Sequence, residues 1–530
     1  MFALSSREYL FILDDNNTMD YVIGVDIGTQ STKALLVNAD GKIVAAESQA
    51  YQVDTPRPMW AEQWPDVWFT AVTDCIKRLT VKAGIPAQSI KALCVSSLYG
   101  GSGIPVNADM KPLHPCLIWM DRRATREVNW VKALPGLDRL MEISGNSVNS
   151  YYGYTKMLWI KNEQREVWKQ IKYFLPPNSY VNFRLTGEVA VDHSSAGNIG
   201  GVYDMQNRCW SEETLAMLGI PLEMMPPRLV ESSEVVAGLS ADWADKLGLT
   251  AGMPVMGGGV DAAMATLAAG VTHPGDHVAM IGTSMCWGYI NDKTDAKHGL
   301  ISMPYVFEGN KKLYIFGGAI TAGASVSWYR EQFCQAEVLR AEEVKCDPHR
   351  LLEEKAGEIA PGSEGVMFLP YLMGERSPIW DPKASGAFVG LSLYHTRAHL
   401  YRAVLEGVTF ALYHNMVTGS KGAAKLDDRL IVVGGAAHSD LWMQIISDVT
   451  GYAVYTIREE VEAALGASLL AASGAGVIDN AAVEQGWIRL DERTRPRPEV
   501  HARYEKQFRL YCDLYPSLRN VMHGLQEQAA

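Results

Sequence analysis

Runs of apolar residues, interrupted by turn residues, mark the opening of the chain as a small sheet. The run from Tyr21 to Asp26 is apolar almost throughout, which is typical of a strand inside a sheet. A second strand is predicted over Lys33–Asn38, and a tight turn at Asp40-Gly41 leads into a third over Lys42–Ala46. We expect a three-stranded meander, followed by a helix from Pro65 to about Ala83.

A second unit of the same kind opens near the middle of the chain. His277–Ile281 predicts a strand that breaks at Gly282-Thr283-Ser284 and resumes over Cys286–Ile290. Both halves therefore begin with an apolar strand, a Gly-Thr turn and another strand, which indicates two copies of one unit facing each other. The alternative is coincidence, because Gly-Thr turns between strands are common.

Short strands and helices alternate elsewhere along the chain. A strand is expected over Ala92–Ser96, and helices over Glu127–Val131 and Tyr154–Val167. In the second half, the strand Ile431–Val433 precedes the helix Leu441–Val449. This alternation predicts the α/β class, with sheets covered by helices.

At 530 residues the chain is too long for a single hydrophobic core, so two domains are expected. The first convincing strand follows Met19, so we expect that residue to be the biological start. Helical spacing of Tyr504, Phe508, Tyr511 and Leu514 indicates a terminal helix that docks on its own domain. The predicted parts are an N-terminal extension (1–20), a first domain (21–269), a second domain (270–480) and a C-terminal helical segment (481–530).

Composition narrows the class of protein. Apolar residues make up 48% of the chain and charged residues 20%, which is ordinary for a globular protein. The net charge of −12 comes without any Lys/Arg-rich run, so neither nucleic acid nor an anionic membrane is an expected partner. No apolar stretch approaches the roughly 18 residues of a membrane span. The eight cysteines stand singly, which predicts reduced thiols and a cytoplasmic location.

The first candidate for chemistry is the turn after the opening strand, Asp26-Ile27-Gly28-Thr29-Gln30-Ser31-Thr32-Lys33. Gly28 lets the backbone approach an anion, and the Thr29 and Ser31 hydroxyls are suited to bond phosphate oxygens. Asp26 would hold hydrated Mg²⁺, and Lys33 would add positive charge. The alternative is a hairpin with a capped Asp. A Walker-type phosphate loop is excluded, because no G-x-x-x-x-G-K-[ST] pattern occurs.

Two further Gly-rich turns are candidates for binding the same ligand. Gly282-Thr283-Ser284 would wrap the terminal phosphates from the second domain. After the strand Ile431–Val433, Gly434 and Gly435 would let an adenine base lie against the backbone, with Ser439 close by. The alternative is that these glycines only form turns, since glycine is common in turns that follow a strand.

A carboxylate stands at the junction of the two halves. Asp261 follows Gly257-Gly258-Gly259-Val260. Phosphoryl transfer to a hydroxyl needs such a group to accept the proton, so Asp261 is the candidate general base. The alternative is an Asp that caps the apolar helix Ala262–Ala269.

Taken together, these motifs resemble the FGGY family of carbohydrate kinases, from Tyr21 to about Gly476. The C-terminal signature of that family is followed closely by Gly386–Leu391, His399-Leu400 and Ala403–Glu406. The N-terminal signature is recognisable in Lys156–Glu163, with Gly153 where Pro, Ser or Thr is usual.

The resemblance implies two ribonuclease H-like α/β domains of the sugar kinase, Hsp70 and actin superfamily, with an interdomain cleft. The first domain would then bind sugar and phosphate and the second would bind nucleotide, with ATP and Mg²⁺ as cofactors. It makes Glu462–Ala467 a helix start that connects the nucleotide site to the sheet. The roles it implies are catalysis for Asp261, metal and phosphate binding for Asp26 and Thr29, phosphate binding for Gly282-Thr283, and nucleotide binding for Gly434, Gly435 and Ser439.

On the sugar side, the resemblance points to three segments as substrate contacts: Trp60–Gln63, Trp119–Arg123 and the junction residue Asp261. Trp60 would be an apolar wall, Glu62 follows it, and Asp121 would accept hydrogen bonds from paired hydroxyls. The alternative is a surface ion pair of Asp121 with Arg123, with Trp60 in the core.

Xylulose kinases usually carry Gln-Met-His-Gly where this chain has Leu98-Tyr99-Gly100-Gly101. The change removes an amide and an imidazole from the expected pocket. Leu98 and Tyr99 would line the pocket instead.

The expected activity is phosphorylation of a small sugar or polyol, with a ketopentose such as xylulose or ribulose first and gluconate or erythritol-type polyols as alternatives. The expected partners are that substrate and ATP, and a homodimer is an open alternative to a monomer. Two rivals of other classes stay open: an actin-like or Hsp70-like ATPase, and a sugar sensor without activity.

Overall fold

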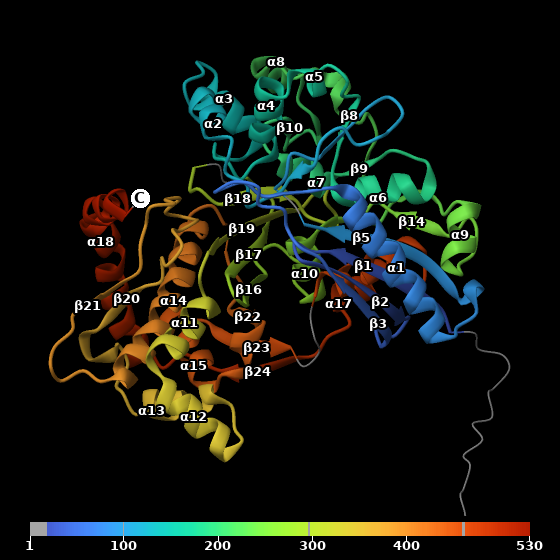
Figure 1. The fold of residues 1–530 in the computed structure, drawn as a ribbon. Coiled ribbons are helices and arrows are strands. Elements are labelled where there is room, and N and C mark those ends of the chain that lie inside the picture. The colour runs from blue at the N-terminus through green and yellow to red at the C-terminus, as the bar shows by residue number, and fades with distance from the viewer. Residues whose placement is uncertain (1–18, 99, 295–296, 424, 458–461, 530) are drawn as a thin grey trace, which may run out of the picture.

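The computed structural model describes residues 19–529 except 99, 295–296, 424 and 458–461. Its first domain is built on a seven-stranded sheet with the order β13-β14-β5-β1-β2-β3, in which β15 also pairs with β5 (Figure 1). The strands β1, β2 and β3 form the predicted antiparallel meander, and β5 lies parallel to β1. The strand bounds are β1 Tyr21–Ile27, β2 Ser31–Asn38, β3 Ile43–Ala50, β5 Ile90–Ser97, β13 Val235–Gly238, β14 Pro254–Met256 and β15 Gly259–Val260.

The second domain repeats this plan with a sheet of the order β18-β19-β17-β16-β22-β23-β24. Here β16, β17 and β19 form the antiparallel meander, and β22 and β23 run parallel to β16. The shared topology confirms the repeated unit that the two Gly-Thr turns indicated. The strand bounds are β16 His277–Ile281, β17 Met285–Asn291, β18 Ile301–Pro304, β19 Leu313–Ala319, β22 Arg429–Val433, β23 Ala453–Ile457 and β24 Leu490–Thr494.

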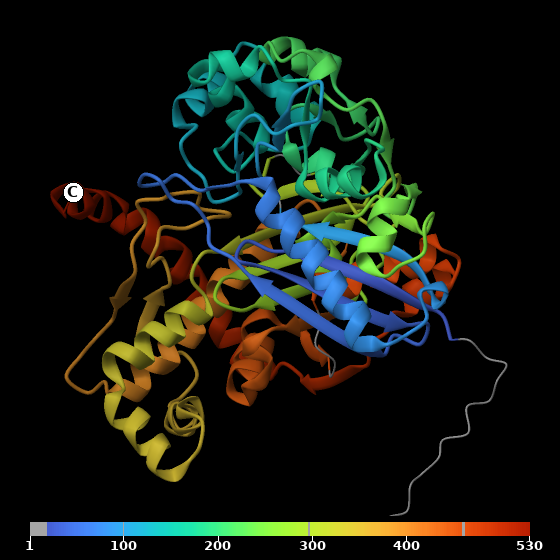
Figure 2. The same cartoon turned by 45° about the vertical axis from the view of Figure 1, so that its right-hand side comes forward.

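Helices cover both faces of the first sheet. The helix α1 (Pro65–Ala83) packs on β2 and β3, and it crosses the blue strands in Figure 2. The other face is covered by α16 (Ala463–Gly474), which contacts β1, β5 and α10 (Asp261–Ala268). Small residues allow this close approach: a Cβ on Gly24 of β1 would lie 2.1 Å from the Ala464 carbonyl oxygen. A helix from the second half thus completes the core of the first domain.

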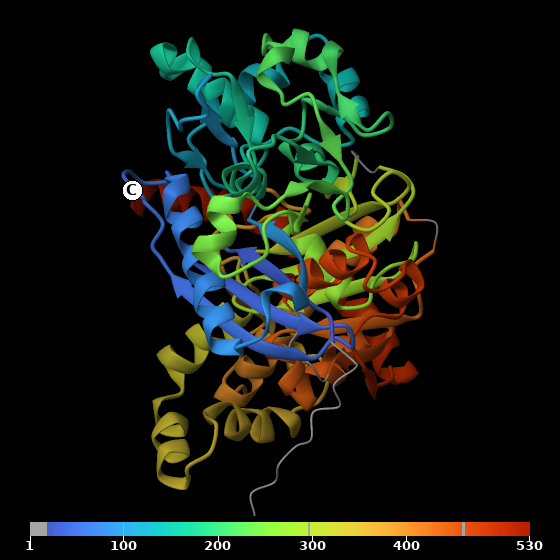
Figure 3. The same ribbon diagram turned by 90° about the vertical axis from the view of Figure 1, so that its right-hand side faces the viewer.

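A lobe of short helices lies above the two sheets in Figures 1 and 3. The predicted helix over 154–167 is divided at Gln164, whose φ of −120° and ψ of 54° are not helical. A helix ends there and a single turn follows. The helices of this part are α2 Thr125–Lys132, α3 Leu137–Ser144, α4 Gly153–Glu163, α5 Arg165–Trp168, α7 His193–Ile199 and α8 Glu212–Leu218. The helix α6 (Pro177–Thr186) packs on β5 and α1 of the first domain instead.

The C-terminal segment contains most of α17 (Asn480–Gln485), the strand β24 and the long helix α18 (Pro498–Ala529). As the helical spacing predicted, this helix docks on the second domain. Tyr504 is buried and donates a hydrogen bond to Glu406 of α14 (Arg397–Gly419), and Phe508 packs on Phe410.

The remaining helices are α9 Ala241–Leu247, α11 Gly323–Phe333, α12 Gln335–Val344, α13 Pro348–Gly357 and α15 Asp440–Thr450. The short strand pairs are β4 Glu62–Gln63 with β7 Cys116–Leu117, β6 Ile104–Val106 with β8 Tyr173–Leu175, β9 Val191–Asp192 with β12 Leu229–Val230, β10 Tyr203–Asp204 with β11 Cys209–Trp210, and β20 Met367–Leu369 with β21 Ala387–Val389. None of the helices in the described part of the chain combines the length and apolar character of a membrane span.

Candidate active site

The turn that joins β1 to β2 is fixed by hydrogen bonds from several elements. The Gly28 N–H donates to the Ser31 carbonyl at 2.9 Å, and the Tyr51 hydroxyl donates to the Gly28 carbonyl at 2.7 Å. The indole N–H of Trp119 donates to the Thr29 hydroxyl at 3.0 Å. The turn is therefore held in one shape, with the Ser31 side chain exposed and Asp26 at the end of β1 beside it.

Lys33 lies opposite Asp26 in the β1–β2 register. Its ammonium group forms an ion pair with Glu462, the residue before α16. The charge that the sequence assigned to phosphate binding is thus shared with a carboxylate from the second half of the chain. The same ion pair ties the meander to α16.

Asp26 and Asp261 form a pair of neighbouring, half-buried carboxyl groups. Burial is the main cause that raises the pKa of Asp26, and a hydrogen bond from the Ser96 hydroxyl at 2.9 Å opposes it. Burial likewise raises the pKa of Asp261, and the charge of Asp26 raises it further. A carboxyl group with a raised pKa is a better proton acceptor than an ordinary aspartate.

Asp261 is the first residue of α10, and Val260 occupies the N-cap position. One Asp261 oxygen accepts a hydrogen bond from the Ala262 N–H at 2.6 Å. The side chain thus does not cap the N–H groups of the second or third helical residue, as an N-cap Asp would. This arrangement fixes one oxygen, and no hydrogen bond from the described residues to the other was found.

The second Gly-Thr turn lies against the start of α11. The N–H groups of Ala322 and Ala324 donate to the Thr283 carbonyl at 2.9 and 3.1 Å, and the Gly282 N–H donates to the Ser284 carbonyl at 3.0 Å. All three turn residues are exposed. Their remaining polar groups are therefore available to a ligand.

A cavity of about 1120 Å³ begins at this turn and continues through the second domain. Gly434, with a φ of 94°, ends β22 beside it, and Gly435 lies on its wall. Ser439 also lines the cavity, while its hydroxyl accepts the N–H of Trp442 and so caps α15. Sequence analysis did not predict the residues of α11 and α13 that also line this cavity, because single residues on separate helices form no local motif. These residues are Trp328, His349, Arg350 and Glu353.

The predicted sugar-side residues surround Arg123, which is almost fully buried. Asp121 accepts hydrogen bonds from the Ala61 N–H at 2.7 Å and from the Arg123 Nε at 2.8 Å. Glu62 pairs with the same guanidinium at 2.6 Å, and the Trp60 ring lies 3.7 Å from it. The ion pair of Asp121 and Arg123 is thus buried, not at the surface as the alternative expected. Contact of Trp60, Glu62 or Asp121 with a sugar stays a prediction.

The segment that departs from the xylulose kinase pattern is tightly packed. Leu98 is 1% exposed and its N–H donates to the Ile27 carbonyl at 2.6 Å, while Tyr99 lies outside the described residues. Gly100 has a φ of 78°, and a Cβ there would lie 2.9 Å from the Trp119 Cβ and 3.0 Å from the Tyr151 ring. Tyr151 and Trp119 thus occupy the space that an imidazole at position 100 would need.

A buried lysine binds the backbone of this segment through hydrogen bonds. The Lys156 ammonium donates to the carbonyls of Gly100 at 2.5 Å and Tyr151 at 2.8 Å. Burial holds the pKa of Lys156 well below its usual range. The role of Lys156 is therefore to hold the backbone of the segment and of Tyr151 in place.

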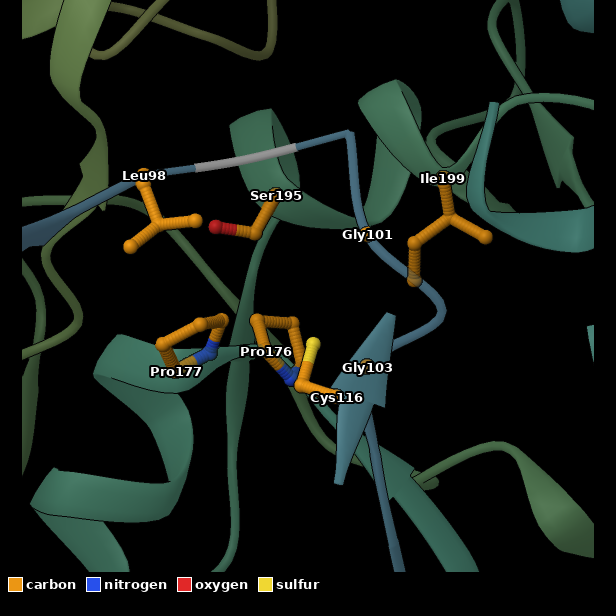
Figure 4. Close-up of a pocket in the computed structure, with 8 residues that line it drawn as sticks. All are labelled: Leu98, Gly101, Gly103, Cys116, Pro176, Pro177, Ser195 and Ile199. Atoms are coloured by element: carbon orange, nitrogen blue, oxygen red, sulfur yellow. The ribbon is translucent and has the colours of Figure 1, made fainter. Parts of the chain in front are cut away.

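The small cavity behind Leu98 is not a substrate site (Figure 4). Its volume is about 10 Å³, which is room for about one water molecule. Its lining includes Cys116, Pro176, Pro177 and Ile199.

Sequence analysis also missed three polar residues, Tyr151, Arg122 and Arg376, of which Tyr151 responds to the charge of Asp261. The pKa of the Tyr151 hydroxyl is raised chiefly by burial, and it responds to the charges of Arg376 and Asp261. Burial, with the charge of Arg376 second, lowers the pKa of Arg122 to about 10. Tyr151, Arg122 and Arg376 come from three separate segments, so no motif joined them.

No group of three or more His, Cys, Asp or Glu side chains suited to hold a metal occurs within the described ranges. Mg²⁺ commonly binds through one or two carboxylates, with water and nucleotide phosphates as its other ligands. The pair of Asp26 and Asp261, whose charges no described cation fully neutralises, fits that kind of site.

Known proteins resemble the chain along nearly all of its length. Residues 21–268 match the N-terminal domain of the FGGY family of carbohydrate kinases, and residues 277–475 match its C-terminal domain. The chain is 31% identical over 513 residues to the xylulose kinase of Lactococcus lactis subsp. lactis (strain IL1403), covering 96% of this chain and 99% of that protein. It is 30% identical over 503 residues to the gluconokinase of Bacillus subtilis (strain 168), covering 94% and 96%.

Among solved structures, the ligand-bound xylulose kinase of Lactobacillus acidophilus has the same fold. Its TM-score is 0.86 at 28% identity, over 94% of this chain and 98% of that one. The two-domain α/β architecture predicted from the sequence is thereby confirmed.

Proposed function

Because the chain belongs to the FGGY family of carbohydrate kinases, we propose that Asp261 is the general base of its phosphoryl transfer from ATP to a sugar or polyol hydroxyl. The observation that supports this is the carboxyl pair of Asp26 and Asp261. Its raised pKa values suit proton transfer near neutral pH.

In the proposed step, the free oxygen of Asp261 takes the proton of the substrate hydroxyl. The hydroxyl oxygen forms a bond to the γ-phosphorus as the bond to the β,γ-bridging oxygen breaks, and ADP leaves. The Ala262 N–H holds the other Asp261 oxygen in place during the transfer. Asp261 then returns its proton to solvent.

The proposed nucleotide site combines the three Gly-rich turns. The first turn would bind the terminal phosphates through Gly28, Thr29 and Ser31, with Lys33 nearby, and the second through Gly282, Thr283 and Ser284. Gly434, Gly435 and Ser439 would face the adenosine in the cavity of about 1120 Å³. Asp26 would hold Mg²⁺, which would supply positive charge to the phosphates when bound.

Two substrate classes are candidates for this site. The name of the Lactococcus lactis relative supports the ketopentose xylulose, and ribulose was the other ketopentose expected from the sequence. The name of the Bacillus subtilis relative supports gluconate at nearly the same identity. An erythritol-type polyol was the further alternative from the sequence.

The test is ADP release by the full chain with MgATP and a panel of pentuloses, aldonates and tetritols. We expect at least one of them to raise ADP release well above the rate without sugar. Asp261→Asn should lower kcat by about 10²–10⁴-fold, the usual range for removal of a general base. Asp245→Asn, an exposed carboxylate on α9, is the matched control and should leave kcat unchanged.

The same assay separates the rival classes. An actin-like or Hsp70-like ATPase would release ADP at a rate that no sugar changes. A sugar sensor would bind a panel member in calorimetry without releasing ADP. Either result would contradict the proposed kinase activity.

A further inference from the structure

Two arginines from different domains are anchored beside the two Gly-Thr turns. Arg122 lies between β7 and α2 of the first domain, and Arg376 lies between β20 and β21 of the second. Arg122 donates from Nη1 to the carbonyls of Trp119 at 2.7 Å and Asp121 at 3.2 Å. Arg376 donates from Nη2 to the Met285 carbonyl at 3.3 Å. Both anchors are near the phosphate turns: Trp119 binds Thr29, and Met285 follows Ser284.

Neither guanidinium has a carboxylate partner among the described residues. The side chain of Asp121 is used by Arg123. Glu375 accepts the N–H groups of Ile320 at 3.0 Å and of Arg376 itself at 2.7 Å, and burial raises its pKa to about 7. The Nε of Arg376 is buried, and none of the residues that the structure describes supplies it with a hydrogen-bond partner.

Without a bound anion, this arrangement of the two arginines destabilises the folded protein. Two half-buried cations close together repel each other, and a buried N–H without an acceptor loses its hydration. The charge of Arg376 does reach Arg122, because it lowers the pKa of that group. An anion between them would supply the missing acceptors and neutralise the charge.

The two arginines and the proposed base are linked through the neighbours that their charges share. The Tyr151 hydroxyl responds to both Arg376 and Asp261, and so does the Cys286 thiol. A short chain molecule that reaches from the guanidinium groups to Asp261 therefore passes these two side chains. Tyr151 and Trp119 also fill the space beside Gly100.

From this geometry we infer that the substrate is a polyhydroxy acid, whose carboxylate is held by Arg122 and Arg376 while a hydroxyl at its other end faces Asp261. The inference rests on the proposed kinase function. A planar guanidinium matches a carboxylate with two parallel hydrogen bonds, which a neutral ketopentose does not offer. Among the candidate classes, this favours an aldonate.

The test compares matched acids and neutral sugars as substrates of the full chain. Aldonates of four to six carbons are assayed beside the alditols of the same carbon skeletons and beside xylulose and ribulose. We expect the highest kcat/KM with an aldonate, at least 100-fold above its alditol. A higher kcat/KM with a neutral sugar would overturn the inference and leave the kinase proposal intact.

The variants separate recognition of the acid from other roles of the arginines. Arg122→Gln should raise the KM for the aldonate by about 10–100-fold, with kcat and the KM for ATP within about twofold of wild type. Arg122→Lys keeps the charge but loses the planar fork, so its KM should be intermediate. Arg126→Gln, 72% exposed on α2, is the control and should change nothing.

The alternative anion is the phosphoryl group in transfer. If the arginines serve it instead, Arg122→Gln lowers kcat equally for acids and neutral sugars, which overturns the inference. Calorimetry of the aldonate with the protein alone is a second measurement that needs no turnover. Absence of aldonate binding there would overturn the inference, whereas binding without any sugar-dependent ADP release would count against the proposed function only.

Discussion

At the scale of single residues, the site brings together groups whose charges are not balanced within the protein. Asp26 and Asp261 are neighbouring carboxylates, and Arg122 and Arg376 are neighbouring cations. Each pair is unfavourable in the free protein. A bound cation with phosphates would reduce the repulsion between the two carboxylates, and a bound acid would reduce the repulsion between the two arginines. Part of the binding free energy would therefore come from the loss of this repulsion.

We predict that Asp261→Asn stabilises the fold although it removes the proposed base. The pKa of Asp261 is raised in the folded protein, so ionisation is less favourable there than in the unfolded chain. Wild type therefore loses stability as pH rises from the unfolded pKa near 4 through the raised folded value, whereas Asn does not titrate. At pH 8 the free energy of unfolding of Asp261→Asn should exceed that of wild type by about 1–2 kcal/mol.

Urea unfolding at pH 8 and near pH 4.5 measures this difference, which should shrink at the lower pH. Asp245→Asn on the surface of α9 provides the comparison and should show no pH-dependent gap. Equal stability of wild type and Asp261→Asn at both pH values would contradict the raised pKa.

At the scale of elements, small residues decide how closely helices approach. A Cβ on Gly466 of α16 would lie 2.0 Å from the Met264 carbonyl oxygen of α10. The two helices are thus in direct backbone contact, and α10 begins with Asp261. The position of the proposed base depends on this contact.

We predict that Gly466→Ala lowers both stability and turnover. Moving α10 away from α16 should cost about 1–3 kcal/mol in the free energy of unfolding, as overpacking usually does. A shift of Asp261 should lower kcat by about tenfold or more, because proton transfer requires close contact. Chemical denaturation and steady-state kinetics measure the two effects.

Gly357→Ala in α13 is the matched control, since a Cβ there meets no atom within 4 Å. Helix propensity should make it up to about 1 kcal/mol more stable with unchanged kcat. If Gly466→Ala behaved like this control, the close contact between α10 and α16 would not position Asp261.

Elements with a strong local pattern were predictable from the sequence. The apolar runs at 21–26 and 277–281 appear as β1 and β16, and the helix from Pro65 to Ala83 has those bounds in α1. The strand β24 was missed, because Leu490–Thr494 is polar and partly exposed at the edge of the sheet. Edge strands carry little alternation, so pairing with β23 decides their structure.

For the site, the turns and Asp261 were visible because glycines and carboxylates follow strands there. Arg122 and Arg376 were not, because each looks like an ordinary loop arginine until the fold brings them together. Trp60, Glu62 and Asp121 were predicted as sugar contacts, with a surface ion pair of Asp121 and Arg123 as the alternative. The buried network around Arg123 was not foreseen, because its burial depends on packing that the sequence does not show.

At the scale of the whole molecule, the two halves of the chain do not separate into independent bodies. The helix α16 follows β23 of the second sheet in sequence but packs on β1, and Glu462 before it pairs with Lys33. A chain cut between the two sheets would leave the first sheet with one face uncovered. This link is also close to the proposed site, because Lys33 faces Asp26 in the β1–β2 register.

The last prediction is that ligands draw the two domains together. Arg122 and the first phosphate turn belong to one domain, and Arg376 and the second turn belong to the other, so one acid and one nucleotide each bridge both. A non-hydrolysable ATP analogue with a reactive aldonate should therefore reduce the radius of gyration in small-angle scattering. The aldonate should add no compaction in Arg122→Gln at a concentration that saturates wild type, while the nucleotide effect persists. Scattering curves that are identical with and without both ligands would contradict closure. Ligands could then bridge the two domains only if the domains were already closed in the free protein.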